Sequence, residues 1–244
     1  MKYFIVIFIT GGLILIHEIG HFLAARWMKI PVARFSIGFG PKLWMFRKRD
    51  TEYWLSMIPI GGYVLPEIKD EDELFQIPVY RRIIFALGGP VTNILLIFFL
   101  FAILNTAMSG FSLTGIAIKP FVQTWRQTCQ FLGAIPRLFS HPSELSGIVG
   151  IVAQGGSFVG TNPLKAMSFS ILLSLNFAIL NLLPIAPLDG GKIILYLMEK
   201  IHPKLSRLHV PLAIAGWVLL IGLMAFATAF DIGRHFVGTF IWTC

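Results

Sequence analysis

The sequence predicts an α-helical polytopic membrane protein of about four transmembrane helices, with a small membrane-associated β-hairpin or sheet after the first helix. Hydrophobic residues make up 56% of the chain and charged residues only 13%, whereas soluble proteins are about 25% charged. Four apolar segments approach the roughly 20 residues that a membrane-crossing helix needs. They cover residues 3–25, 83–108, 166–188 and 209–230. We therefore treat residues 1–244 as a single membrane domain.

The positive charge of the chain is distributed unevenly among its loops. The net charge is +8, which could indicate nucleic acid, but the basic residues lie beside apolar segments, as in a protein that faces anionic lipid. Loop 26–82 carries ten Lys and Arg residues, whereas the equally long loop 109–165 carries four. Loop 189–208 also carries four in a much shorter stretch. The positive-inside rule therefore predicts cytoplasmic first and third loops, with both termini outside. The lipid bilayer is the expected partner, and nucleic acid is not.

Two loops carry patterns of their own. Residues 31–66 contain ARFSIGFGPKLWMF and EYWLSMIPIGGYVLP, which are rich in β-branched and aromatic residues and are separated by the polar RKRDT. This pattern predicts a hairpin or small sheet that dips into the membrane. Before the third span, residues 121–139 favour an amphipathic helix, and the glycine-rich residues 147–160 favour a re-entrant segment. Simple packing between spans explains these last two patterns equally well.

The stretch LILIHEIGHFLAARW places His17, Glu18 and His21 inside the first apolar span. On a helix, residues i and i+4 share one face, so both imidazoles can point at one metal ion while Glu18 flanks it. This is the H-E-x-x-H arrangement, in which two histidines bind zinc and the glutamate acts as general base. A lone buried histidine is usually a hydrogen-bonded core residue. Three ionisable groups together indicate a functional site, because each costs about 2–3 kcal/mol or more within a span.

A catalytic zinc site needs a third protein ligand, with water in the fourth position. The candidate is Asp189 in NLLPIAPLDGG, which the charge pattern places at the same depth as HEIGH. Pro184 and Pro187 break the helix there, and Gly190 and Gly191 free the backbone. An unwound segment could thus aim the carboxylate at the metal. The alternative is a helix stop followed by a surface aspartate.

These elements together resemble the site-2 protease family of intramembrane zinc metalloproteases. HEIGH and NLLPIAPLDGG fit its two metal motifs, and LGGPVTN at 87–93 fits a Gly-Pro-x-x-Asn motif of its second conserved helix. FSIGFGP and IPIGGYV are similar to the first-loop β region of the bacterial branch that cleaves anti-sigma factors. That branch usually carries PDZ domains between the second and third conserved spans. Residues 109–165 are too few for a PDZ domain beside the amphipathic segment.

The resemblance implies one Zn²⁺ per chain, held by His17, His21 and Asp189. It also implies that Glu18 is the general base for hydrolysis of peptide bonds within or near transmembrane helices of other proteins.

The resemblance further implies that Asn181, and by analogy Asn93, contacts the substrate backbone or the oxyanion. The implied partners are transmembrane protein substrates, such as an anti-sigma factor or a signal-peptide remnant. The implied location is the bacterial inner membrane, with the active site near the cytoplasmic side.

A helical substrate must unwind before cleavage, and the strand-like first loop offers an edge to which it could add as a strand. We expect Ile37 and Tyr63 to lie on this edge. Two alternative functions are a zinc-binding membrane transporter or channel, and an inactive scaffold of the same fold. A transporter needs polar residues along a whole route, which the fourth span does not supply. A scaffold has no need for Glu18.

Overall fold

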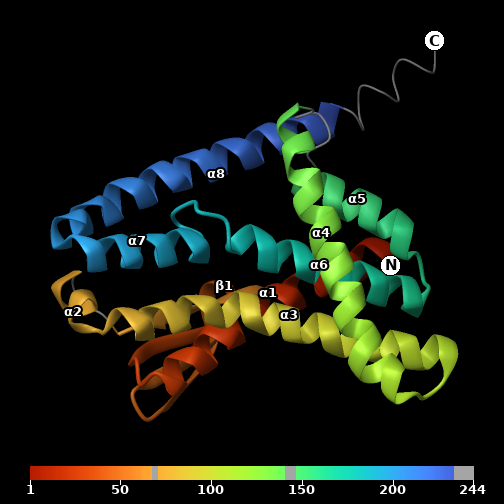
Figure 1. The fold of residues 1–244 in the computed structure, drawn as a ribbon, viewed down its shortest axis with the longest axis horizontal. Coiled ribbons are helices and arrows are strands. Elements are labelled where there is room, and N and C mark those ends of the chain that lie inside the picture. The colour runs from red at the N-terminus through yellow and green to blue at the C-terminus, as the bar shows by residue number, and fades with distance from the viewer. Residues whose placement is uncertain (68–70, 141–146, 234–244) are drawn as a thin grey trace.

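The computed structural model describes residues 1–67, 71–140 and 147–233 (Figure 1). Its elements, in chain order, are α1 (Lys2–Trp27), β1 (Val32–Lys48), β2 (Thr51–Pro66), α2 (Glu71–Gln76), α3 (Val79–Ser109), a π-helix (Thr114–Ile118), α4 (Lys119–Ser140), α5 (Ile148–Val159), α6 (Pro163–Asn181), α7 (Asp189–Ile201), a 3-10 helix (Pro203–Leu208) and α8 (His209–Ile232).

Four helices of the described chain, α1, α3, α6 and α8, are long and apolar enough to cross a membrane. The predicted fold class is therefore confirmed. The third span is shorter than predicted, because α6 ends at Asn181 and residues 182–188 are irregular. Pro184 and Pro187 explain this end, since each lacks the backbone N–H that a helix needs. Apolar composition alone could not separate this stretch from the span.

Helix α3 is the central helix and packs against both α1 and α6. Gly20 of α1 and Gly88 of α3 let the two backbones meet. A methyl group added at either glycine would overlap the carbonyl oxygen of the other. Small residues allow this close approach of helices in membranes. On its other side, α3 forms an apolar core with α6, made by Ile97, Phe101, Ile171 and Leu175.

Strands β1 and β2 form the small antiparallel sheet that the sequence predicted for residues 31–66. Both strands bend, so residues 34–37 pair with residues 52–55 on one side and with residues 62–65 on the other. Residues 62–66 therefore form the edge of the sheet that packs against α1. Ile37 lies inside the sheet, contrary to our expectation, because this bend gives it the partners Leu55 and Gly62.

The described part of the connection between α3 and α6 contains the π-helix, α4 and α5. α4 runs across the direction of α3 and α6 in Figure 1, and its exposed side chains include Phe121 and Trp125. It matches the amphipathic segment expected at residues 121–139. α5 covers the glycine-rich stretch, and its first turn meets the end of α8. There the buried Asp231 carboxylate accepts hydrogen bonds from the backbone N–H groups of Gly147 and Gly150, at 2.7 and 2.8 Å.

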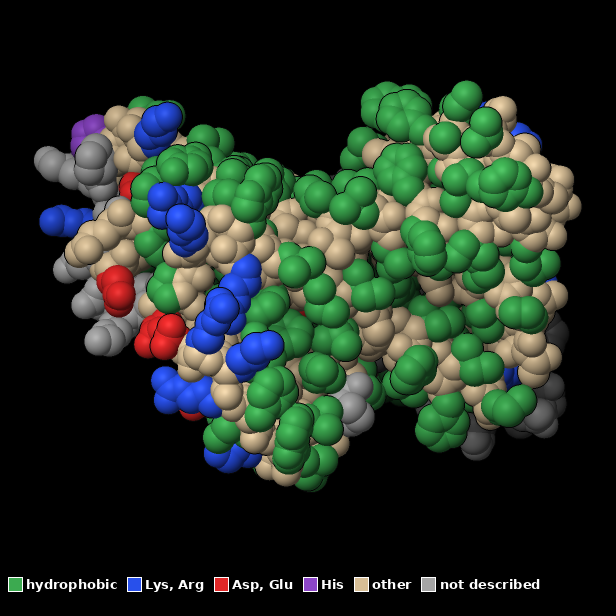
Figure 2. Space-filling model, turned by 90° about the horizontal axis from the view of Figure 1, so that it is seen from below, with side chains coloured by type: hydrophobic (Ala, Val, Ile, Leu, Met, Phe, Trp, Pro, Cys, Tyr) green, Lys and Arg blue, Asp and Glu red, His purple; other side chains and the backbone are tan. Residues whose placement is uncertain are grey.

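Charged side chains gather at one end of the molecule (Figure 2, left). In Figure 1 this end holds the sheet, α2 and the connection from α7 to α8. Hydrophobic side chains cover much of the remaining visible surface. The first and third loops thus lie at the same end of the helices, as the charge pattern predicted.

Candidate metal centre

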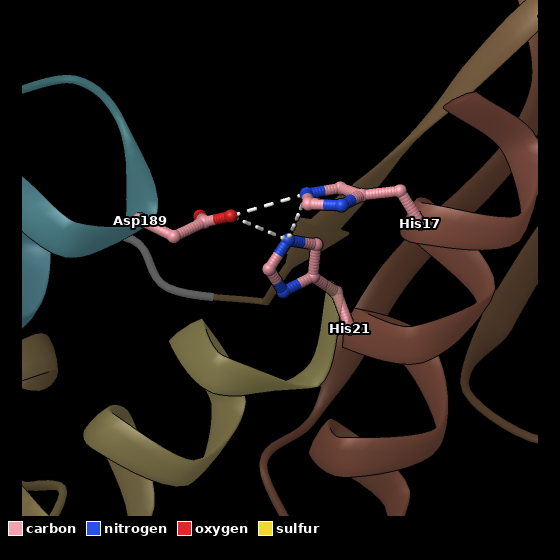
Figure 3. Close-up of side chains that lie close together, drawn as sticks. All are labelled: His17, His21 and Asp189. Atoms are coloured by element: carbon pink, nitrogen blue, oxygen red, sulfur yellow. Dashed lines mark hydrogen bonds and ion pairs between the residues drawn. The ribbon is translucent and has the colours of Figure 1, made fainter. Parts of the chain in front are cut away.

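Three buried side chains from α1 and α7 converge on one point (Figure 3). His17 Nε2 lies 3.1 Å from Asp189 Oδ2, and His21 Nε2 lies 3.2 Å from both of these atoms. A tetrahedral zinc ion with N and O ligands about 2.0–2.2 Å away would hold its ligand atoms about 3.4 Å apart. The triangle is close to that size, so these residues fit a zinc ion. The predicted third ligand thus meets the two histidines, 172 and 168 positions away in sequence.

Helix α1 presents both histidines to α3, and the facing residue must be small. A methyl group added at Gly89 would overlap the Nε2 atoms of both His17 and His21. The glycine belongs to LGGPVTN, where sequence reasoning had singled out Asn93 alone. The missing side chain at Gly89 thus leaves the space in which the candidate ligand atoms meet.

Asp189 is the first residue of α7 and follows the irregular residues 182–188. Gly190 and Gly191 pack directly against this segment, and a methyl group at either would overlap its backbone. The two glycines therefore permit a close turn that aims the Asp189 carboxylate at α1. The two residues after Asp189 are therefore glycines because a side chain would not fit there, more than because their backbone angles require glycine.

The two oxygens of Asp189 have different partners. Oδ2 faces the histidines, while Oδ1 accepts a hydrogen bond from Lys192 Nζ at 3.1 Å. Burial alone would raise the pKa of the Asp189 carboxyl, but its hydrogen bonds with His17 and His21 hold that pKa well below its usual range. A group with this low pKa is a carboxylate at neutral pH and can serve as a metal ligand.

A buried ion pair fixes α7 against α3. Arg82 of α3 donates two hydrogen bonds to the carboxylate of Glu199 of α7, both 2.7 Å long. Arg82 also lies over the ring of Tyr196, 4.7 Å from its centroid. Paired, charge-assisted hydrogen bonds have a fixed geometry. This contact holds the helix that begins with Asp189, and sequence reasoning missed it because the two partners lie 117 positions apart.

Glu18 lies beside the cluster and borders the same cavity of about 750 Å³. Its carboxylate accepts a hydrogen bond from the backbone N–H of Val64, on the edge of β2, at 3.2 Å. Tyr63 also borders this cavity, as does Asn181 at the end of α6. Asn93 is fully buried instead, with its amide nitrogen 3.3 Å from His17 Nδ1. The cavity therefore brings together the ligands, Glu18, Tyr63 and Asn181, while Asn93 lies behind His17.

Fold and site define a multi-pass membrane protein with a buried cluster of two histidines and one aspartate that fits a metal ion. Residues 3–224 match the model of peptidase family M50, and the chain belongs to this family. The resemblance to site-2 proteases is thereby confirmed.

Three bacterial relatives are each named "Putative zinc metalloprotease". The protein of Thermotoga maritima is 40% identical over 120 residues, which are 45% of this chain and 24% of that protein. The protein of Fusobacterium nucleatum is 25% identical, and the alignment covers 97% of this chain and 100% of that protein. The protein of a Synechocystis species is 24% identical, and the alignment covers 91% of this chain and 92% of that protein. The latter alignments extend over 338 and 337 positions, so these relatives contain segments that these 244 residues lack.

Proposed function

We propose that this protein is an intramembrane zinc metalloprotease that hydrolyses peptide bonds within or near transmembrane helices of other membrane proteins. The observation that carries the proposal is the buried cluster of His17, His21 and Asp189, with Glu18 on the same cavity. Family membership and the names of the relatives support zinc as the metal. The single cluster found among the described residues supports one ion per chain.

Bound zinc would supply a water molecule acidic enough to lose a proton near neutral pH. Glu18 is placed to accept that proton, because its carboxylate borders the same cavity as His17, His21 and Asp189. It can then donate the proton to the amine that leaves the cleaved peptide bond. Asn181 borders the same cavity, where its side chain can contact the substrate carbonyl. The apolar lining keeps bulk water away from the reacting groups.

The replacement Glu18→Gln tests this assignment, because an amide keeps the size of the side chain but cannot accept the proton. We expect purified Glu18→Gln protein to retain zinc and to cleave a transmembrane-helix substrate about 10²- to 10⁴-fold more slowly. Glu52→Gln, on the sheet, is the control and should cleave at the wild-type rate. Wild-type cleavage by Glu18→Gln would contradict the base role and leave an ion pathway or a scaffold as the alternative.

The edge of β2 supports substrate binding as an added strand. Backbone groups of successive residues point to opposite sides of a strand. Since the N–H of Val64 points away from β1 toward Glu18, the N–H of Gly62 shares that direction and that of Tyr63 points toward β1. An extended substrate could therefore pair with Gly62 and, once it displaces the Glu18 carboxylate from the N–H of Val64, with Val64. The side chain of Tyr63 borders this position.

Val64→Pro removes the outward N–H, and proline is tolerated on an edge strand. We expect zinc content to stay constant and kcat/KM for a helical substrate to fall roughly tenfold, the value of about one hydrogen bond. Val64→Ala keeps the N–H and should retain activity. Equal activity of the proline and alanine variants would rule out pairing at this position.

The proposed setting is the bacterial inner membrane, with the site near the cytoplasmic side and both termini outside. The charged end of the molecule supports this orientation through the positive-inside rule. α4 would then lie outside, where Cys129 is exposed. In a Cys244→Ser background, a membrane-impermeant thiol reagent added to intact spheroplasts should label Cys129. Labelling only after lysis would reverse the orientation. Proposed substrates are transmembrane proteins such as anti-sigma factors or signal-peptide remnants.

A further inference from the structure

The amide of Asn93 lies against His17 with an unusual imbalance of hydrogen bonds. Its nitrogen is 3.3 Å from His17 Nδ1. Its oxygen has no hydrogen-bond partner in the described chain, although the side chain is fully buried. Buried polar atoms are nearly always paired, so an orphaned acceptor needs an explanation. The oxygen and nitrogen of an amide have almost the same shape, and the hydrogen-bond network decides which one faces a partner.

His21 shows what a zinc-binding histidine needs on its second nitrogen. Its Nδ1 donates a hydrogen bond to the backbone oxygen of Phe85 at 2.8 Å. This donor role places the ring proton on Nδ1 and leaves a lone pair on Nε2 for the metal. Metal-ligating histidines usually have such an acceptor behind them.

His17 must meet the same requirement, because its Nε2 is the atom that faces Asp189 and His21. Binding zinc through Nε2 requires the proton on Nδ1, where an acceptor is then needed. The group at that position is the Asn93 amide, whose nitrogen can only donate. If the amide turned over, Asn93 Oδ1 would accept the hydrogen bond that His17 Nδ1–H needs to donate. Both atoms would then be paired.

We propose that Asn93 is a positioning residue whose amide oxygen faces His17 when zinc is bound. This inference rests on the proposed zinc site. With zinc bound, His17 Nδ1–H would donate a hydrogen bond to Asn93 Oδ1, which fixes the ring with Nε2 toward the metal. The amide can present its oxygen in this way because its two ends have almost the same shape.

The surroundings of Asn93 suit this role. Its backbone is held in α3, and its carbonyl oxygen accepts a hydrogen bond from Ser174 of α6 at 3.1 Å, so the side chain is anchored behind His17. The acceptors for both histidines, Phe85 and Asn93, then come from α3.

Zinc affinity measured by chelator competition on the full chain in detergent tests the role of Asn93. Asn93→Leu keeps the size of the side chain but removes both polar atoms, and we expect zinc to bind about 10- to 100-fold more weakly. Asn93→Asp retains the acceptor and should bind zinc within a few-fold of wild type. The control is Asn105→Leu on the same helix, whose amide pairs with Gln123, and zinc affinity should not change there. Wild-type affinity of Asn93→Leu, or equal weakening by Asn93→Asp, would overturn the proposal.

The hydrogen bond itself can be read from ¹⁵N-histidine NMR of the zinc-loaded wild-type chain, which depends on no variant. We expect Nδ1 of both His17 and His21 to be protonated with zinc bound. An unprotonated His17 Nδ1 in the zinc-loaded sample would overturn the inference while the zinc site stands. A wild-type chain that binds no zinc would overturn the proposed function together with this inference.

Discussion

Helices α1 and α3 meet at backbone distance, whereas a smaller share of α8 is buried against the rest of the molecule. In the most apolar stretch of α1 and of α3, 28% of residues are buried, against 11% in α8. The histidines and the acceptors behind them lie on the close-packed pair, while α8 contributes Trp217 and Leu220 to the wall of the cavity. His17 and His21 are thus held by many more buried neighbours than the wall of the cavity that α8 provides.

Separating α1 from α3 should reduce stability and zinc content more than releasing one end of α8 does. In Gly20→Val, the new side chain would overlap Gly88 of α3, so the helices must move apart and the histidines with them. We expect a loss of stability of at least about 1–3 kcal/mol and a loss of stoichiometric zinc. Thermal unfolding in detergent and metal analysis measure both quantities.

The matched control is Gly12→Val on the same helix, where an added side chain meets open space. It should retain both stability and zinc. Equal damage by the two variants would mean that valine in α1, and not the crossing with α3, causes the loss.

Releasing the C-terminal end of α8 should cause a smaller loss of stability. Asp231→Ala removes the carboxylate that accepts hydrogen bonds at the start of α5. By analogy with helix caps, we expect stability to fall by about 0.5–2 kcal/mol. Zinc affinity should be preserved, because Gly216, nearer the other end of α8, keeps its contact with Ala186. Hydrogen exchange should quicken around Gly147 and at the C-terminal end of α8 only. Release of zinc by this variant would contradict the separation between the metal cluster and this end of α8.

The sequence predicted the spans well because hydropathy follows burial in lipid. It overextended the third span because residues 182–188 are as apolar as a helix. It located the sheet at residues 31–66 but misplaced Ile37, since strand composition does not reveal where strands bend. Pairing on both sides of residues 34–37 depends on that bend.

The structure brings together the predicted ligands, because H-E-x-x-H fixes two of them on one helix face and membrane depth restricts the third. The groups behind the ligands could not be predicted in the same way. Phe85 contributes a backbone oxygen, which every residue has, and Gly89 contributes only space. Asn93 was noticed through its motif, but its burial behind His17 became visible only in the fold.

The contact between Gly216 of α8 and Ala186, in the segment before Asp189, has a thermodynamic consequence. No methyl group fits between the two, so an outward movement of α8 removes support from the segment that carries the third ligand. Binding free energies are reciprocal: to the extent that opening α8 weakens metal binding, bound metal must oppose opening. Chelation should therefore speed hydrogen exchange in α8. Loss of the metal and outward movement of α8 would then favour each other within one equilibrium.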